Sequence, residues 1–244
     1  GDIDVPGSPS RSDAMLLASV DLTQKNVHVI SIPRDTRVNI PGHKGLEKIN
    51  NAYFYGGSTL ALKTLEDFLH ISIPYYMTAK WQGFIEVVDI LGGVDLYVEH
   101  DMDYEDPYAN LAIHLHKGYQ HLNGEQAGEY VRFRHDELGD IGRVERQQKF
   151  LKALSEQFWR AETIVKIPYL VSAVHRNLEM NMSIATSLQA ANVLRGLKSG
   201  QFVAEMLPGN FATIDNISYW EPDKTQIKLL IERAFAAQAL PVAP

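Results

Sequence analysis

Short apolar runs rich in β-branched residues alternate along this chain with segments whose apolar residues recur at helical spacing, a pattern typical of an α/β fold. The first two runs, AMLLASVDL at 14–22 and NVHVISIP at 26–33, flank the polar turn TQKN and predict a β-hairpin. Further strands are predicted at 74–80, 94–100 and 201–207. Helices are predicted at 58–71, 81–93, 141–159, 163–178, 183–197 and 222–239. A short helix that continues as extended chain is predicted at 123–134, and an irregular polar segment at 101–121. Because no linker or repeat divides the pattern, we expect one domain over residues 1–244.

The composition excludes several classes of protein. The chain has 244 residues, a formal net charge of −7 and a pI near 5.7, so no overall basic field favours nucleic acid, and we expect no nucleic-acid partner. It has no cysteine, which excludes disulfides and thiolate metal sites. No run of about 18 apolar residues, the length of a membrane-spanning helix, occurs in it. The opening GDIDVPGSPSRSD predicts a loop, and we expect the natural protein to extend further toward its N-terminus.

Arginine is unevenly distributed in this acidic chain. Seven of the eleven arginines fall in three short segments, which contain Arg11, then Arg34 and Arg37, and finally Arg132, Arg134, Arg143 and Arg146. The lysines, by contrast, are scattered. The guanidinium group is a rigid planar fork that binds two phosphate oxygens at once, whereas an ammonium group is a hydrated point charge. Clustered arginine in an acidic protein therefore predicts a focused anion site.

The spacing within the last segment predicts that its guanidinium groups point together. If YVRFR is extended, the period of two places Arg132 and Arg134 on one face. If a helix begins at Asp140, its first two turns carry a polar stripe near the helix start, where the dipole favours an anion. The members of this stripe are Arg143, Arg146 and Gln147. The alternative is a solvated stripe paired with Asp136, Glu137 and Glu145.

Two carboxylates lie beside the arginines at strand boundaries. Asp13 enters the first predicted strand and Asp35 leaves the second. Since hairpin strands are antiparallel, the start of one and the end of the other lie at the same end of the sheet. Carboxylate oxygens near phosphates are the usual setting for Mg²⁺, so we expect a magnesium site there. The alternative is that both aspartates form salt bridges with their arginine neighbours.

Several of these motifs together resemble the LytR-CpsA-Psr family of bacterial cell-envelope phosphotransferases. The resemblance extends over residues 11–155 and rests on RSDAMLLASVD, ISIPRDTRVNIPG, EKINNAYFYGG, VDILGGVDLYV, HLNGEQAGEYVRFR and DIGRVERQQKFLKAL, which occur in family order. It implies a three-layer α/β/α domain with a central mixed sheet and a long apolar pocket for a polyprenyl tail. The apolar residues of 81–91 and 150–174 are the expected pocket lining.

The resemblance also implies roles for individual residues. Arginines that hold a diphosphate are matched by Arg34, Arg132, Arg134 and Arg143, with support from Arg11, while Arg37 and Arg146 are further candidates for substrate binding. Asp13 matches a magnesium ligand, Asp140 an aspartate that orients the arginines, and Asp35 a neighbouring partner. Lys48 and Gln147 match polar residues near the head group. The family pattern has a further strand ending in a metal-binding aspartate before RSD, and here GDIDVPGSPS stands in that place, so the second magnesium ligand is left open.

The function implied by the resemblance is a magnesium-assisted transfer. A phospho-glycopolymer, of the teichoic acid or capsule type, passes from a polyprenyl diphosphate carrier to a hydroxyl of peptidoglycan. Members of the family are generally anchored by one N-terminal transmembrane helix, with the catalytic domain on the extracytoplasmic face of the bacterial cell membrane. The general base is left open among Asp13, Asp35 and Asp140. The alternatives are a polyprenyl diphosphate-binding protein or hydrolase without glycan transfer, and a transcriptional regulator.

Overall fold

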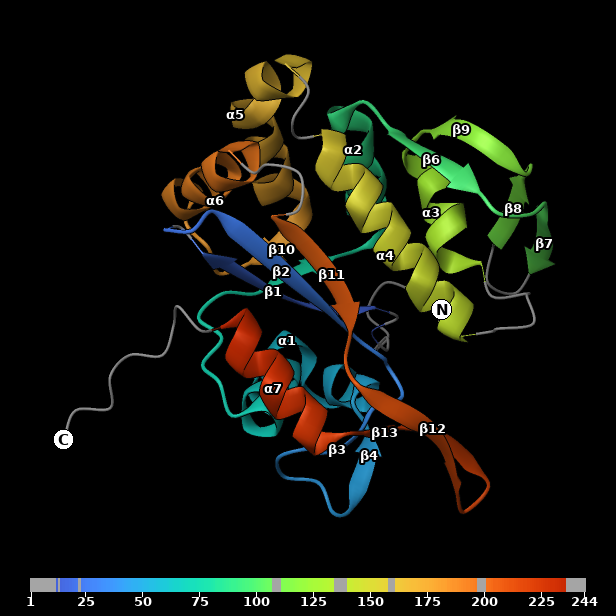
Figure 1. Cartoon of the computed structure of the whole chain (residues 1–244), viewed down its shortest axis with the longest axis vertical. Coiled ribbons are helices and arrows are strands. Elements are labelled where there is room, and N and C mark those ends of the chain that lie inside the picture. Colours follow the sequence, from blue (N-terminus) through green and yellow to red (C-terminus); the bar gives the residue numbers. More distant parts are fainter. Residues whose placement is uncertain are drawn as a thin grey trace. The chain divides into compact units, whose positions relative to one another are not determined.

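The chain has the mixed α/β fold predicted from its sequence (Figure 1). The computed structural model describes residues 12, 14–21, 23–106, 111–133, 140–157, 161–196 and 201–235. It divides into two compact units, unit 1 from residues 1–74 and 205–244 and unit 2 from residues 75–204. Each unit is described by itself below. The single domain and the apolar lipid pocket stay predictions.

Unit 1 is built around the predicted hairpin. Its elements are β1 (Met15–Asp21), β2 (Asn26–Ile32), β3 (Arg37–Asn39), β4 (Leu46–Lys48), α1 (Asn50–Leu69), β12 (Gly209–Ile214), β13 (Ile217–Pro222) and α7 (Lys224–Ala234). Strands β1 and β2 pair antiparallel from Met15 opposite Ile32 to Asp21 opposite Asn26, which confirms the hairpin. β2 is the central strand of three, between β1 and β11 (Phe202–Met206), within which the boundary between the units falls.

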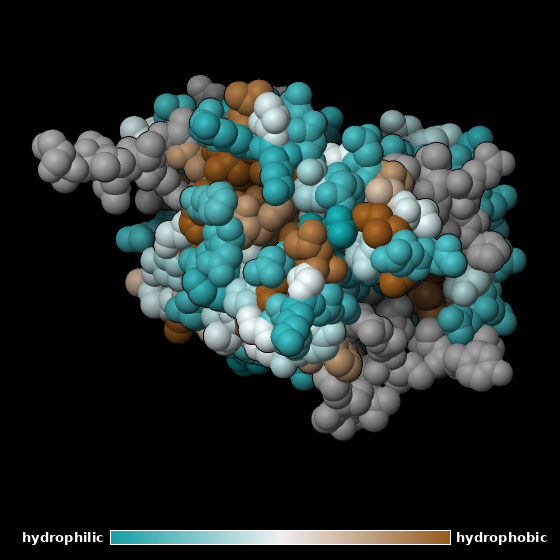
Figure 2. Space-filling model, turned by 90° about the horizontal axis from the view of Figure 1, so that it is seen from below, coloured by the Kyte–Doolittle hydropathy of each residue, from teal (hydrophilic) through white to brown (hydrophobic). Residues whose placement is uncertain are grey.

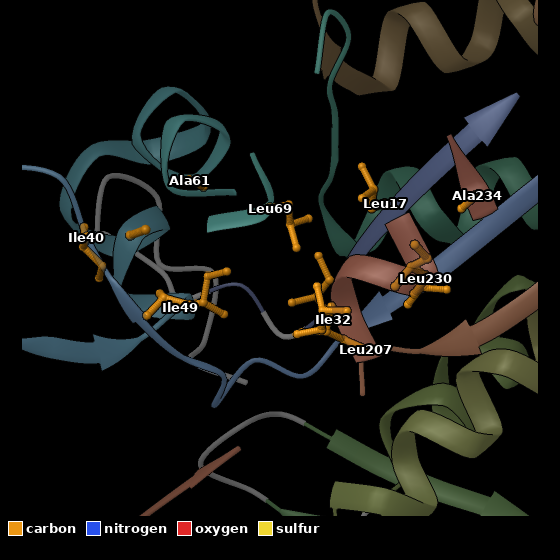
Figure 3. Packing of buried hydrophobic residues seen from close by; sticks show 13 residues of the cluster. Leu17, Ile32, Ile40, Ile49, Ala61, Leu69, Leu207, Leu230 and Ala234 are labelled. Atoms are coloured by element: carbon orange, nitrogen blue, oxygen red, sulfur yellow. The ribbon is translucent and has the colours of Figure 1, made fainter. Parts of the chain in front are cut away.

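The core of unit 1 joins this hairpin to helices from both ends of the unit. Figure 3 shows Leu17 and Ile32 of the hairpin close to Leu207 and to Leu230 of α7. Ile30 on β2 has no exposed surface. Burying a side chain of this size contributes about 1.5–3 kcal/mol. The core therefore fixes the end of β2 from which the candidate site begins.

Helix α1 begins at Asn50, eight residues before the predicted start at Ser58. Gly56 and Gly57 interrupt it with non-helical backbone angles, and Gly57 has a φ of 60° that a side chain would strain. The predicted helix therefore corresponds to the part that follows this kink. The sequence pattern lost the first part because the glycine pair breaks the helical spacing.

Unit 2 contains the remaining elements. They are β5 (Met77–Ala79), α2 (Trp81–Leu91), β6 (Val94–Val98), β7 (Met102–Asp106), β8 (Leu111–Leu115), β9 (Gly118–Leu122), α3 (Gly124–Arg132), α4 (Asp140–Gln157), α5 (Ala161–Asn177), β10 (Leu178–Met180) and α6 (Ile184–Gly196). Within it, β6 pairs with β9, β7 with β8 and β5 with β10, all antiparallel. The predicted end of α2 at the glycine pair is confirmed, because Gly92 adopts the left-handed conformation with a φ of 88°.

Two predictions for unit 2 are wrong. Residues 101–121 hold the strands β7 and β8 and most of β9, whereas the sequence predicted irregular chain. Arg132 is the last residue of α3, not part of an extended segment, so it does not alternate with Phe133 across a strand. A capping box between Asn123 and Gln126 starts α3 and favours helix over strand there.

A partly buried polar contact joins elements around the core of unit 2, which includes Val94, Leu96, Val98 and Tyr130. The Tyr130 hydroxyl donates to both carboxylate oxygens of Glu99, at 3.0 and 3.2 Å, and the Lys149 ammonium group forms an ion pair with the same carboxylate. Burial acts to raise the pKa of Glu99, but the hydrogen bonds from Lys149, the backbone and Tyr130 together hold it below its ordinary value. Burial raises the pKa of Tyr130 and of Glu129. The contact joins α3 and α4 to the segment after β6.

The surface of the face shown in Figure 2 is largely hydrophilic, with separate hydrophobic patches. Among the helices in the described ranges, none is both long and apolar enough to cross a membrane.

We predict opposite effects for two glutamates of this core. Because the folded pKa of Glu99 is lowered, its ionised form stabilises the fold above about pH 4.5, and this stabilisation is lost as the pH falls through the folded pKa. Glu99→Gln should therefore lower the free energy of unfolding at pH 7 by about 1–3 kcal/mol, with a smaller loss in acid. Denaturant unfolding at pH 7 and below pH 4 measures both.

The matched control is Glu129→Gln. The folded pKa of Glu129 is raised, so its ionised form opposes folding at pH 7, and the substitution should leave the free energy of unfolding unchanged or increase it. Equal losses for both variants at pH 7 would contradict the assignment.

Candidate functional site

The loop that carries Arg34 in unit 1 is held by its backbone. Three successive carbonyl oxygens, those of Arg34, Asp35 and Thr36, accept hydrogen bonds from distant parts of the unit. The donors are the N–H groups of Asn50 at 3.2 Å, Trp220 at 2.9 Å and Ile49 at 2.9 Å, in that order. The Thr36 hydroxyl and N–H both donate to the Pro33 oxygen, at 2.6 and 3.0 Å. The loop therefore has little freedom to move its backbone.

The predicted polar residues of unit 1 meet around this loop. The Lys48 ammonium group lies 3.0 Å from a carboxylate oxygen of Asp35, so these two predicted site residues are neighbours. Arg37 forms an ion pair with Glu221 at 3.3 Å. Arg37 and Lys48 also lie 5.7 and 5.8 Å from the ring centre of Tyr219, within the range of a cation–π contact. Arg34, which directly precedes Asp35 in the sequence, is half-buried.

A close contact between helices α2 and α3 positions the predicted arginine of unit 2. Gly124, Gly128 and Arg132 are spaced four residues apart and lie on one face of α3. A Cβ atom at Gly124 would lie 2.3 Å from the backbone oxygen of Ile85, and one at Gly128 would lie 2.1 Å from the Trp81 ring. Both glycines are thus required by the close approach of α2.

Arg132 completes this face by stacking on the same tryptophan. Its guanidinium carbon lies 4.5 Å from the centre of the Trp81 ring, and Phe84 stacks on the same ring with the ring centres 6.1 Å apart. An arginine over a tryptophan face gains about 0.5–2 kcal/mol, depending on its exposure to water. The contact fixes the direction of the Arg132 side chain at the end of α3.

Helix α4 begins at Asp140, as predicted, so the predicted spacing of Arg143, Arg146 and Gln147 on its first turns is present. Arg143 and Arg146 are each 3% exposed, which is unusual for arginine. Arg146 donates a 2.6 Å hydrogen bond to the Phe133 carbonyl and lies 5.3 Å from the Phe133 ring centre. Arg146 thereby fixes the residue that directly precedes Arg134. Gln147 is half-buried.

Several predicted residues lie outside the part of the chain that the structure describes. They are Arg11, Asp13 and Arg134, together with the side chain of Asp140. Within the described ranges, no three histidine, aspartate or glutamate side chains are grouped so as to hold a metal ion. The magnesium site, for which Asp13 was the predicted ligand, therefore stays a prediction.

Comparison of the sequence with known proteins identifies the family of the chain. The profile described as the LytR_cpsA_psr family matches residues 4–235. The chain is a member of this family. Among its curated relatives is Polyisoprenyl-teichoic acid--peptidoglycan teichoic acid transferase TagV of Bacillus subtilis, 35% identical over 228 residues that cover 91% of this chain. Regulatory protein MsrR of Staphylococcus aureus is 36% identical over 72% of the chain. The chain spans 58% of the length of TagV and 53% of that of MsrR.

Solved structures of relatives share the fold of this LytR-CpsA-Psr protein. The crystal structure of B. subtilis TagV matches with a TM-score of 0.82 and 32% identity, covering 96% of this chain and 93% of TagV. A structure of TagT bound to LI-WTA matches with a TM-score of 0.77 and 28% identity, covering 94% of this chain and 86% of TagT. The resemblance seen in the motifs is therefore confirmed over nearly the whole chain.

Sequence reasoning missed the part that Gly124, Gly128 and Trp81 play in positioning Arg132. Gly124 and Gly128 were not singled out, and Trp81 was considered only as part of the expected pocket lining, although the i, i+4, i+8 spacing of the two glycines and Arg132 was visible in NGEQAGEYVR. That spacing marks a helix face too close to its neighbour for a side chain. The assumption of an extended segment hid it.

We predict that Gly128→Ala destabilises the protein by displacing the Trp81 ring. Overpacking of this kind costs about 1–3 kcal/mol, which exceeds the gain of roughly 1 kcal/mol from the better helix propensity of alanine. Denaturant unfolding measures the change.

A double-mutant cycle with Trp81→Ala supplies the control. In that background the contact is gone, and Gly128→Ala should be neutral or stabilising. An equal loss of unfolding free energy with and without Trp81 would show that contact with the Trp81 ring does not cause the effect of Gly128→Ala.

Proposed function

We propose that this protein transfers a phospho-glycopolymer from a polyprenyl diphosphate carrier to a hydroxyl of peptidoglycan. The observation that carries the proposal is the 35% identity to TagV over 91% of the chain, because the name of TagV states a transfer of this kind. The likeness to TagT bound to LI-WTA supports the same class of substrate. The enzyme class is accordingly a phosphotransferase.

The arginines supply most of the chemistry in this proposal. Phosphoryl transfer asks a protein mainly to position the reactants and to stabilise negative charge. Arg34, Arg132, Arg134 and Arg143 bind the diphosphate oxygens, and Arg11, Arg37, Lys48, Arg146 and Gln147 support the head group. As the bond to polyprenyl phosphate breaks, these cations stabilise the charge on the departing phosphate.

The contacts of the described residues suit this role. The Trp81 ring holds one face of the Arg132 guanidinium group, and the bonded carbonyls of the Arg34 loop hold its backbone in place. Arg146 fixes Phe133 and so the start of the segment that carries Arg134. Side chains fixed before the substrate arrives lose less entropy on binding it.

Magnesium is the cofactor we propose. Met15 opposes Ile32, so the residues that follow β2 lie at the open end of the hairpin, and Asp35 supplies a carboxylate there, a donor that suits Mg²⁺. Asp13 would hold the ion, with Asp35 as a neighbouring partner. A bound Mg²⁺ would neutralise charge on the diphosphate. Asp140 would orient the arginines.

We place the reaction at the extracytoplasmic face of the bacterial cell membrane, with a single-pass anchor outside the present sequence. The polyprenyl carrier is a membrane lipid, and peptidoglycan lies outside that membrane. A hydrolase or a carrier-binding protein with no glycan acceptor is the alternative that uses the same residues. A regulatory role is suggested by the name of MsrR alone, and the acidic charge of this chain opposes DNA binding.

We predict that Arg134→Ala and Asp13→Ala each lower the transfer rate by about two to three orders of magnitude, the usual cost of removing one such electrostatic group. The measurement is transfer of labelled glycopolymer from a polyprenyl diphosphate to peptidoglycan in the presence of Mg²⁺. Both variants should keep the wild-type unfolding midpoint.

Arg176→Ala is the matched control, because Arg176 contacts Tyr169 and Ser172 and lies outside the family motifs. It should leave the rate unchanged. Wild-type rates in a folded Arg134→Ala or Asp13→Ala variant would refute the role of that residue. Product that appears in water and does not increase when acceptor is supplied would favour the hydrolase.

A further inference from the structure

Strands β6 and β9 pair antiparallel, with β7 and β8 between them in the sequence, and this pair has one face in the core and one in solvent. Val94, Leu96 and Val98 of β6 are buried, and the alternation of the strand turns Asp95 and Tyr97 outward. The antiparallel register places Tyr119 of β9 opposite Tyr97 and His121 opposite Asp95. Figure 1 shows the two strands side by side. The four outward residues, Asp95, Tyr97, Tyr119 and His121, are named here the hairpin platform.

The platform combines an exposed aromatic corner with a polar pair. Tyr119 is 86% exposed and Tyr97 43% exposed. Their ring centres are 5.1 Å apart at an interplanar angle of 69°, so the edge of one ring meets the face of the other. Beside them, a His121 ring nitrogen lies 2.7 Å from a carboxylate oxygen of Asp95, and both side chains are about half exposed.

We propose that the hairpin platform binds a neutral oligosaccharide built of pyranose rings. A pyranose ring has an apolar face of C–H groups, which matches the negative face of a tyrosine ring, and a rim of hydroxyl groups. Asp95 accepts hydrogen bonds, and His121 donates or accepts them, so the pair matches a hydroxyl rim. Paired tyrosines offer this contact at low entropic cost because they have few rotatable bonds.

The charge around the platform selects a neutral glycan over an anionic one. The segments 94–106 and 111–122, which form the strand pairs β6–β9 and β7–β8, carry six carboxylates and one lysine, and one of the six, Glu99, pairs with Lys149 outside these segments. The carboxylates are Asp95, Glu99, Asp101, Asp103, Glu105 and Asp106. A polymer of phosphates would be repelled by this field. Uncharged sugars are not.

A second polar pair lies on the neighbouring hairpin. Asp103 of β7 and His114 of β8 are cross-strand partners, and a ring nitrogen of His114 lies 2.7 Å from a carboxylate oxygen of Asp103. Both side chains are exposed. The same combination of acceptor and imidazole is therefore presented twice in unit 2, and the second pair offers an extended chain with repeated hydroxyl groups a further contact of the same kind.

This site contains none of the residues assigned to phosphate chemistry and goes beyond the transferase reaction. Its test needs no lipid carrier, acceptor transfer or magnesium. Failure of the glycan contact and failure of the proposed reaction are therefore separate results.

The experiment titrates the purified protein with chitotetraose, the β-1,4-linked tetramer of N-acetylglucosamine, and follows binding by NMR and calorimetry. We expect saturable binding, with the largest amide shifts in β6 and β9. Tyr119→Ala should weaken binding about tenfold, and Tyr119→Phe should keep it within about twofold, because the ring face is retained. At 86% exposure, neither substitution disturbs the core.

Tyr75→Ala is the matched control, since Tyr75 is a 49% exposed tyrosine of the same unit outside both strand pairs. It should bind like the wild type. Absence of binding by the wild type at millimolar chitotetraose, or equal weakening by Tyr75→Ala, would overturn the proposal. Shifts in β6 and β9 caused by polyglycerol phosphate or polylysine, with none caused by chitotetraose, would assign the platform to a charged ligand and overturn it as well.

Discussion

The contact between α2 and α3 is the constraint on which the candidate site in unit 2 depends. Two glycines let the helices approach until the α3 backbone touches Ile85 and the Trp81 ring. The third residue of the same stripe, Arg132, then has that ring as its support. Arg146 connects α4 to Phe133 just beyond. A family motif that reads as a cluster of charges is thus, in physical terms, a close helix contact that carries charges at its end.

Much of the fold follows from the spacing of apolar residues, but the short strands rich in polar residues do not. The β1–β2 hairpin and the helices α2 and α7 were predictable because each buries one apolar face. In β7, three of the five residues of MDYED are carboxylates, which are depleted in strands, and the segment forms a strand by pairing with β8. The β12–β13 hairpin was missed although its turn residues, Asp215 and Asn216, are of the types that favour hairpin turns. Both adopt the positive φ values that such turns require.

The residue types of the site were predictable from the sequence, but the side chains that contact and position them were not. Clustering pointed to arginine, and the family motifs gave the positions. Local spacing could not reveal that Lys48 pairs with Asp35, that Tyr219 lies under Lys48 and Arg37, or that Trp81 supports Arg132, because these contacts join segments far apart in the chain. Such contacts depend on how elements pack, which a single sequence does not encode locally.

The bonded carbonyls of residues 34–36 couple the stability of this loop to two other segments. Their donors belong to the beginning of α1 and to β13, which are separated by about 170 residues of sequence. Fraying of the C-terminal hairpin would release the Asp35 carbonyl, and so loosen a turn near the opposite end of the chain. Protection of the Trp220 amide against hydrogen exchange thus reports on the order of the Arg34 turn.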